Sequence, residues 1–199
     1  GDEEWRVLAK RWAKAFAVLF AVGAVSGTVL SFELGLLWPE FMGRWGAVIG
    51  LPFTLEGFAF FIEAIFVGIY LYSWDRLSPK VHFLTGIPIA ISGAASACFV
   101  LMVNAWMQVP GGFDLTDGKV TAVRPLEVFF NPATVPLALH MVVAAYVVTG
   151  SLVAATYAFL RLRGKDGLHE RRAMALGLLL ALPLALPQAL VGDLTAKVV

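Results

Sequence analysis

Two glutamates interrupt the otherwise apolar stretch EGFAFFIEAIF, seven residues apart at Glu56 and Glu63. On an α-helix this spacing places both carboxylates on one face, about two turns apart. An ionised carboxylate deep in a membrane costs at least ~2.5 kcal/mol, so each is expected to be protonated, bound to a metal cofactor or facing water. The alternative is a neutral carboxyl that hydrogen-bonds between helices. Glu33 is expected at a depth close to that of Glu56, either in a cluster with it or extending toward water.

His140 lies in a second apolar stretch, PLALHMVVAAYV. On spacing alone it is either a neutral imidazole that hydrogen-bonds a facing Ser, Thr or Asn, or an axial ligand of a haem iron. The small residues Ala144 and Gly150 favour the haem, because they would leave space beside the imidazole for a flat macrocycle, although small residues also serve helix contact. His82 and His169 stand at predicted cytoplasmic helix starts and are expected to be solvated.

Several other features are interpreted as structural. Gly23 to Gly27 and Ser92 to Ser96 are small-residue faces that favour close helix packing. Two prolines are expected to kink the last apolar segment beside Gln188. The sequence contains no glycine-rich phosphate loop, CxxC or HExxH pattern, which gives no support for nucleotide or protein-ligated zinc chemistry. The net charge of +1 gives no indication of a nucleic-acid partner.

The composition requires a membrane to position these residues. Of the 199 residues 59% are hydrophobic and only 15% are charged, whereas soluble domains carry roughly 25% charged residues. We therefore predict an all-α fold, a polytopic transmembrane helix bundle formed as a single unit by residues 1–199. Five apolar segments are long enough to cross the bilayer. They are expected at about 14–37, 49–73, 82–107, 133–160 and 172–192.

Basic residues orient the predicted bundle. Eleven of the fifteen Lys and Arg residues fall in the N-terminal segment and near residues 76–80 and 161–172, which all lie on one side. The positive-inside rule makes this side cytoplasmic. The N-terminus of the chain is then cytoplasmic, and its C-terminus is external.

Three longer motifs carry a family resemblance: GTVLSFELGLLWP from residue 27, EGFAFFIEAIFVGIYLYSWDRLSP from residue 56 and NAWMQVP from residue 104. Together with a closing Val-Gly-Asp at 191–193, they resemble subunit I of the cytochrome bd-type quinol oxidases over nearly the whole chain. The resemblance implies a full subunit of nine helices, of which this chain would be the second to the sixth. Such a fragment is expected to be inactive alone, because axial ligands and the quinol-binding loop would lie outside it.

The resemblance also implies roles for individual residues. His140 matches the axial ligand of a low-spin haem b, whose Met partner would lie beyond residue 199. Glu56 matches a glutamate beside the oxygen-reducing haem, and Glu63 matches one associated with proton delivery. The best-known members space these two glutamates eight residues apart rather than seven, which leaves the register of Glu63 open. Glu33 occupies a position where other members carry Gln, so its catalytic role is the least supported.

The expected function is that of a bd-type terminal oxidase in a prokaryotic cytoplasmic (inner) membrane, oxidising quinol at the outer face and reducing dioxygen to water with cytoplasmic protons. The implied cofactors are two haems b and a haem d or a b-type replacement. The implied partners are subunit II, small single-helix subunits and membrane lipid. Two alternatives remain open, a haem-binding membrane-anchor subunit without oxygen chemistry and a proton-coupled transporter.

Overall fold

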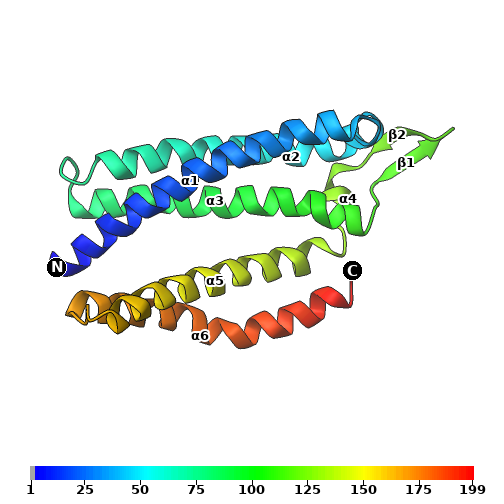
Figure 1. The fold of residues 1–199 in the computed structure, drawn as a ribbon. Coiled ribbons are helices and arrows are strands. Elements are labelled where there is room, and N and C mark those ends of the chain that lie inside the picture. Colours follow the sequence, from blue (N-terminus) through cyan, green and yellow to red (C-terminus); the bar gives the residue numbers. More distant parts are fainter. Residues whose placement is uncertain (1–2) are drawn as a thin grey trace. The chain divides into compact units, whose positions relative to one another are not determined.

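The computed structural model describes residues 3–199, which fold almost entirely as α-helices (Figure 1). In chain order the elements are α1 Glu3–Leu37, α2 Pro39–Tyr72, α3 Pro79–Gln108, β1 Phe113–Thr116, β2 Lys119–Val123, α4 Pro125–Phe129, α5 Thr134–Leu162 and α6 Leu168–Ala196. Among the described residues, five helices (α1, α2, α3, α5 and α6) are long and apolar enough to cross a membrane. The predicted class, an all-α polytopic membrane protein, is therefore confirmed.

Four of the five long helices begin earlier than the hydrophobic segments predicted. α2 starts at Pro39 rather than near residue 49, and α3 starts at Pro79 rather than near residue 82. Both starts place proline in the first turn, where its fixed φ suits a helix and its missing N–H costs nothing. A search for apolar residues misses these turns because they carry polar residues such as Glu40 and Lys80.

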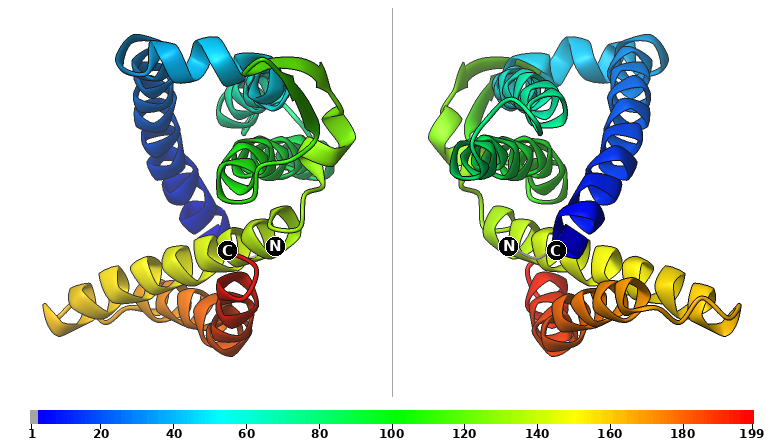
Figure 2. Two further views of the ribbon diagram at one scale, coloured as in Figure 1. Left: turned by 90° about the vertical axis from the view of Figure 1, so that its right-hand side faces the viewer. Right: turned by 90° about the vertical axis from the view of Figure 1, so that its left-hand side faces the viewer.

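α2 changes direction after its first turns, which run across the line of the rest of the helix (Figure 2). Pro52 lies inside α2 and is buried. A proline within a helix cannot donate to the carbonyl four residues before it, and its ring pushes that carbonyl away, so a bend at this place is expected. The predicted start near residue 49 therefore falls close to the bend rather than at the beginning of the helix.

Contacts divide the chain into two compact units. The larger, Trp12–Thr134, holds most of α1, together with α2, α3, the β-hairpin and α4. Its α2 and α3 lie side by side (Figures 1 and 2). At the hairpin end a hydrophobic core forms around Val48, Ile49, Val103, Trp106 and Val128.

A β-hairpin lies in the connection between α3 and α4. β1 and β2 pair antiparallel, and the turn between them has positive φ at both central residues, 52° at Asp117 and 75° at Gly118. Asp-Gly is a preferred dipeptide for such turns, because the short Asp side chain and the missing glycine side chain tolerate left-handed backbone. The sequence therefore carries a hairpin signal between FDLT and KVTAV.

The smaller unit joins Val135–Val199 to the first residues of the chain, up to Arg11. α5 and α6 cross at Gly150 and Gly177, where backbone meets backbone: a Cβ added at Gly150 would lie 2.7 Å from the carbonyl oxygen of Gly177. Gly150 therefore leaves no open space for a macrocycle, and that part of the sequence interpretation is wrong. At the α5–α6 turn, Arg161 and Arg171 both donate to the Asp166 carboxylate.

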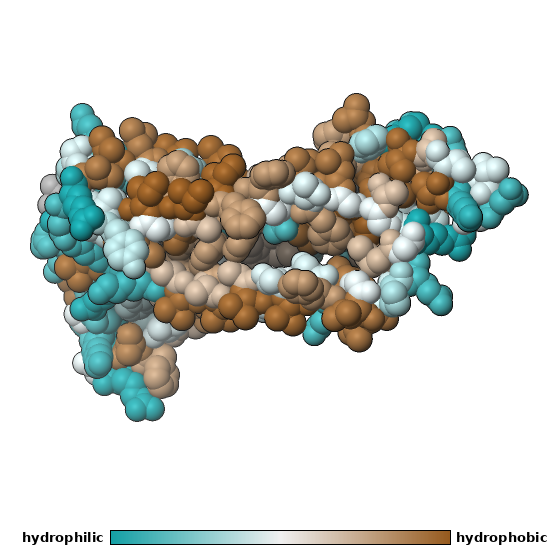
Figure 3. Space-filling view, turned by 90° about the horizontal axis from the view of Figure 1, so that it is seen from above, coloured by the Kyte–Doolittle hydropathy of each residue, from teal (hydrophilic) through white to brown (hydrophobic). Residues whose placement is uncertain are grey.

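Hydrophobic side chains cover much of the helix surface. Figure 3 shows them over the middle of the face that α1 and α2 present, with hydrophilic side chains around the β-hairpin. Examples are Val22 on α1, which is 62% exposed, and Phe61 on α2, which is 67% exposed. Exposed apolar surface of this extent suits contact with lipid or with other membrane helices.

Candidate functional site

The carboxylates of Glu56 and Glu63 both turn toward α3, so the prediction that they share one helix face is confirmed. The Ser96 hydroxyl donates to Glu56 Oε1 over 3.1 Å. One turn earlier on α3, a Cβ added at Gly93 would lie 3.0 Å from Glu63 Oε1. The small-residue face of α3 thus packs on α2, as predicted, and it also makes room for two acidic side chains.

Neither carboxylate has a basic partner. In residues 3–199 no ion pair joins Glu56 or Glu63 to a Lys or Arg, and both side chains are half-buried. A charge in such surroundings is costly, whereas a neutral carboxyl can donate or accept a hydrogen bond. Acidic side chains in such surroundings can bind or release a proton when a reaction requires it.

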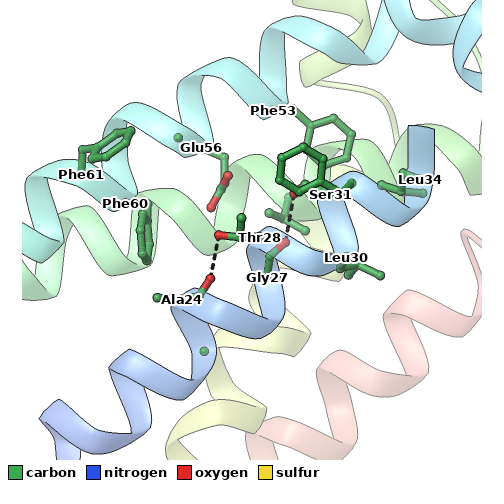
Figure 4. Close-up of a pocket in the computed structure, with 14 residues that line it drawn as sticks. Ala24, Gly27, Thr28, Leu30, Ser31, Leu34, Phe53, Glu56, Phe60 and Phe61 are labelled. Carbon is green, nitrogen blue, oxygen red and sulfur yellow. Dashed lines mark hydrogen bonds between the residues drawn. The ribbon is translucent and has the colours of Figure 1, made fainter. Parts of the chain in front are cut away.

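A cavity of about 520 Å³ lies beside Glu56, between α1 and α2 (Figure 4). Glu56 is the one ionisable residue among the described residues that line it, and its carboxylate lies between Ser96 of α3, which donates to it, and Thr28 of α1. Phe53, Phe60 and Phe61 provide much of the remaining wall. An apolar cavity with a single proton-binding group suits a flat hydrophobic cofactor or a small apolar molecule.

The small-residue face of α1 lines this cavity instead of packing closely on another helix. A Cβ added at Gly23 or Gly27 would meet nothing within 4 Å. Thr28 and Ser31 donate their hydroxyls to carbonyls of α1 itself, over 2.8 Å and 3.0 Å. Within residues 3–199 the expected close packing at Gly23 to Gly27 is not observed, because these residues line open space instead of contacting another helix.

Two other sequence predictions have different outcomes. Glu33 is exposed and does not line the cavity, so its suggested catalytic role stays a prediction without structural support. His82 was expected to be solvated, but it is only 7% exposed. Its Nε2–H donates to the carbonyl of Tyr70 over 3.0 Å, and its ring lies 4.3 Å from that of Tyr70 and 4.2 Å from that of Trp74. These contacts bury the imidazole between α2 and α3.

His140 is half-buried on α5 and faces α6. The amide Nε2 of Gln188 lies 3.1 Å from Nδ1 and 3.2 Å from Nε2 of the imidazole. This contact was not predicted, because the only sign of it in the sequence is that Gln188 is a polar residue in an apolar helix. Within the described part of the chain, no group of three or more His, Cys, Asp or Glu side chains could hold a metal ion.

The surroundings of His140 fit an axial ligand, which needs one unprotonated ring nitrogen for iron and an acceptor for the other. Gln188 Oε1 is buried and has no hydrogen-bond partner among the described residues. Leaving such an acceptor unpaired costs ~1–3 kcal/mol. A buried amide with a spare acceptor beside the imidazole is a second partner of the kind that metal-bound histidines use.

Comparisons with known proteins identify the family of this chain. The chain is 39% identical over 200 residues to the putative cytochrome bd menaquinol oxidase subunit I of Bacillus subtilis (strain 168), covering 98% of this chain and 45% of that protein. It is 32% identical over 180 residues to the cytochrome bd-II ubiquinol oxidase subunit 1 of Escherichia coli (strain K12), covering 89% of this chain and 35% of that protein.

A solved structure agrees with these relatives. The bd oxidase from Geobacillus thermodenitrificans superposes with a TM-score of 0.94 at 42% identity, over 98% of this chain and 46% of that one. The chain thus spans less than half the length of the proteins it matches. The family profile described as cytochrome bd terminal oxidase subunit I matches residues 1–199. The chain therefore belongs to the family of subunit I of the cytochrome bd terminal oxidases.

Proposed function

We propose that this chain is part of the haem-bearing subunit of a bd-type oxidase that oxidises a quinol and reduces dioxygen to water. The family and five apolar helices make it a multi-pass inner-membrane protein. Because the chain spans less than half of its relatives, the activity is proposed for the complete protein, whose nine-helix bundle would include both units described above. Its partners would be subunit II, small single-helix subunits and membrane lipid. Alone, residues 1–199 are expected to be inactive.

The observation that carries this proposal is the pair of unpaired carboxylates on α2. Glu56 and Glu63 both face α3, with Ser96 and Gly93 as neighbours and no basic partner within residues 3–199. Seven residues of helix separate the two carboxylates by about 10 Å along the axis. Reduction of dioxygen to water consumes protons, and two carboxyls at two depths of an apolar helix bundle can each take up and release a proton, with water molecules bridging the distance between them.

Haem is the cofactor that the family implies, and it would supply the electron transfer and the oxygen chemistry. His140 would hold the iron of the low-spin haem b through one ring nitrogen. Glu56 would line the site of the oxygen-reducing haem, a haem d or a b-type replacement, next to the cavity of about 520 Å³. Glu63 would deliver protons to Glu56 from the cytoplasmic side.

The experiment uses the complete oxidase, purified with its partner subunits. Glu63→Gln keeps the size of the side chain and removes its proton, so oxygen consumption with a quinol is expected to fall about a hundredfold while the haem content stays constant. Thr54→Val is the matched control on α2, because the Thr54 hydroxyl bonds only to the carbonyl of Gly50 on the same helix. Normal turnover in the Gln variant would refute the proton role.

His140→Ala separates the proposal from its alternatives. Loss of the low-spin b-type absorption bands, with the bands of the oxygen-site haem retained, would support the oxidase. If the wild-type complex has b-type bands alone and no oxygen consumption, the protein is a haem-binding anchor. If it has no haem bands, a proton-coupled transporter becomes the better explanation.

The proposed orientation places the N-terminus of the chain in the cytoplasm and its C-terminus outside. The β-hairpin turn at Asp117 would then be external and the α5–α6 turn at Lys165 cytoplasmic, and both residues are exposed. With Cys98 replaced by Ser, single cysteines at these two positions should differ in labelling of intact cells by a membrane-impermeant thiol reagent. Labelling at position 165 and not at position 117 would reverse the orientation.

A further inference from the structure

The closest polar partner of the proposed haem ligand is an amide on the neighbouring helix. Gln188 Nε2 lies 3.1 Å from His140 Nδ1 and 3.2 Å from His140 Nε2, so the amide nitrogen lies against the face of the ring, about equally far from its two nitrogens. We propose that Gln188 is a positioning residue for His140: it accepts the N–H of the imidazole nitrogen that does not bind iron and thereby fixes the tautomer and the ring plane. This inference rests on the proposed haem role of His140.

The spare atom of the amide supports this role. Gln188 Oε1 is buried without a hydrogen-bond partner among the described residues, while Nε2 contacts the ring. Turning the amide by half a rotation exchanges these two atoms, and a turn of the ring about its Cβ–Cγ bond then points one N–H at the acceptor. A histidine bound to metal through one nitrogen carries its proton on the other, and such histidines characteristically donate this proton to a carbonyl or carboxylate oxygen.

The same face of α6 leaves room for the ring. Gly192 follows Gln188 by one turn, and a Cβ added there would lie 3.3 Å from His140 Cε1 and 3.5 Å from Nδ1. The imidazole therefore rests directly against the α6 backbone at this glycine. Gln188 supplies the hydrogen bond, and Gly192 allows the ring to reach it.

The expected effect follows from electron donation. An N–H that donates to an acceptor makes the imidazole a stronger electron donor, which stabilises ferric over ferrous iron. Gln188→Leu removes the acceptor, so the oxidised-to-reduced ratio of the low-spin haem at a fixed ambient potential should fall roughly tenfold, an upward shift of ~59 mV in the midpoint potential. Gln188→Glu keeps an acceptor oxygen and should leave the potential at or below that of the wild type.

The test is a redox titration of the low-spin haem in the complete purified oxidase, with electron paramagnetic resonance of the ferric haem as a second readout of the ligand plane. Thr195→Val is the matched control, because Thr195 donates to the carbonyl of Pro136 over 3.2 Å and so also joins α5 to α6, away from the imidazole. Gln188→Met serves as the apolar variant of similar length if the Leu variant does not assemble.

The outcomes separate the two proposals. An upward shift in the apolar variant, absent from Thr195→Val and reversed in Gln188→Glu, supports the positioning role. An apolar variant with the potential and resonance spectrum of the wild type overturns it, and so does a shift equal to that of Thr195→Val. If His140→Ala retains the low-spin haem, the proposed function fails, whatever the Gln188 variants do.

Discussion

Glycines are used in opposite ways in the two units of this chain. On α1, Gly23 and Gly27 meet no neighbour within 4 Å of an added Cβ, and both line the cavity beside Glu56. Where α5 crosses α6, an added Cβ at Gly177 would lie 2.6 Å from the carbonyl oxygen of Gly150. One pair of glycines creates space, and the other removes it.

The difference shows that a small residue in a membrane helix only removes side-chain volume and does not by itself produce close packing. Close approach needs a small residue on the partner helix as well, as Gly177 and Ala181 provide for Gly150. The face of α1 meets large rings on α2 instead: Phe20 stacks on Phe60 with centroids 5.3 Å apart. These bulky contacts keep the helices apart, so the glycines of α1 face a cavity.

The largest expected effect is at the helix crossing. Gly177→Ala places a methyl group 2.6 Å from a carbonyl oxygen and 2.7 Å from the backbone nitrogen of Ala154, atoms that cannot move without displacing a helix. We expect a loss of stability of ~1–3 kcal/mol and less assembled oxidase, measured by the thermal midpoint and the yield of purified complex. Gly23→Ala, with nothing within 4 Å, should leave both quantities unchanged. Equal losses of stability in Gly177→Ala and Gly23→Ala would contradict the difference between the two pairs of glycines.

The second prediction fills the cavity. Gly27→Leu projects a large apolar side chain into a space of about 520 Å³, so the helices should stay packed while access to Glu56 is reduced. We expect turnover or oxygen-site haem content to fall about tenfold with little change in the thermal midpoint. Gly35→Leu is the matched control, because Gly35 is also open but does not line the cavity. Destabilisation by Gly27→Leu would indicate that this face packs against something after all.

The third prediction concerns Gly93, whose surroundings are intermediate between the open glycines of α1 and the closely packed glycines of α5 and α6. A Cβ there would lie 3.0 Å from Glu63 Oε1, at the end of a side chain that can adjust. Gly93→Ala should therefore displace the carboxylate with little loss of stability and slow oxygen consumption several-fold. Gly86→Ala on the same helix meets a Tyr70 ring at an ordinary 3.5 Å and serves as the control.

A second substitution makes the Gly93 prediction stricter. Glu63→Asp shortens the acidic side chain by one methylene group. It should therefore reduce turnover less in the Gly93→Ala background than in the wild-type background. Additive losses in turnover would show that the glycine and the glutamate act independently.

Helix number and type could be predicted from the sequence, because spans of this length need long apolar segments and nothing else in the chain has them. The shared face of Glu56 and Glu63 was also predictable, since it depends only on the helical repeat. The bend at Pro52 and the Asp117-Gly118 turn had local signals that a search for apolar spans passes over. Such signals depend on neighbours a few residues away.

What could not be predicted depends on neighbours far apart in the chain. His82 is buried because Tyr70 of α2 and Trp74, in the turn after α2, flank it, and the sequence around His82 contains no sign of this. Gln188 faces His140 across 48 positions of sequence. A polar residue in an apolar helix indicates that a partner exists, but only the helix packing identifies that partner.

The smallest expected effect lies at the exposed α5–α6 turn, the second place that holds these helices together. Hydrogen bonds from Arg171 and Arg161 lower the pKa of Asp166 from 3.8 to about 2. A carboxyl with a depressed pKa stabilises the folded state fully above its unfolded value and loses this contribution as the pH falls through its folded value. The contribution of Asp166 should therefore be constant near neutral pH and disappear between about pH 4 and pH 2.

Asp166→Asn tests this pH dependence, which can be compared with that of the backbone contact between Gly150 and Gly177. The thermal midpoints of wild type and variant should differ slightly near pH 6, less at high salt because the pair is exposed, and should converge as the pH approaches 2. Lys165→Gln, next to Asp166 but outside its ion pairs, should leave the wild-type pH dependence in place. The loss in Gly177→Ala, by contrast, is steric and should persist across the same range. If it also vanished in acid, the helix crossing would depend on charge rather than on close backbone contact.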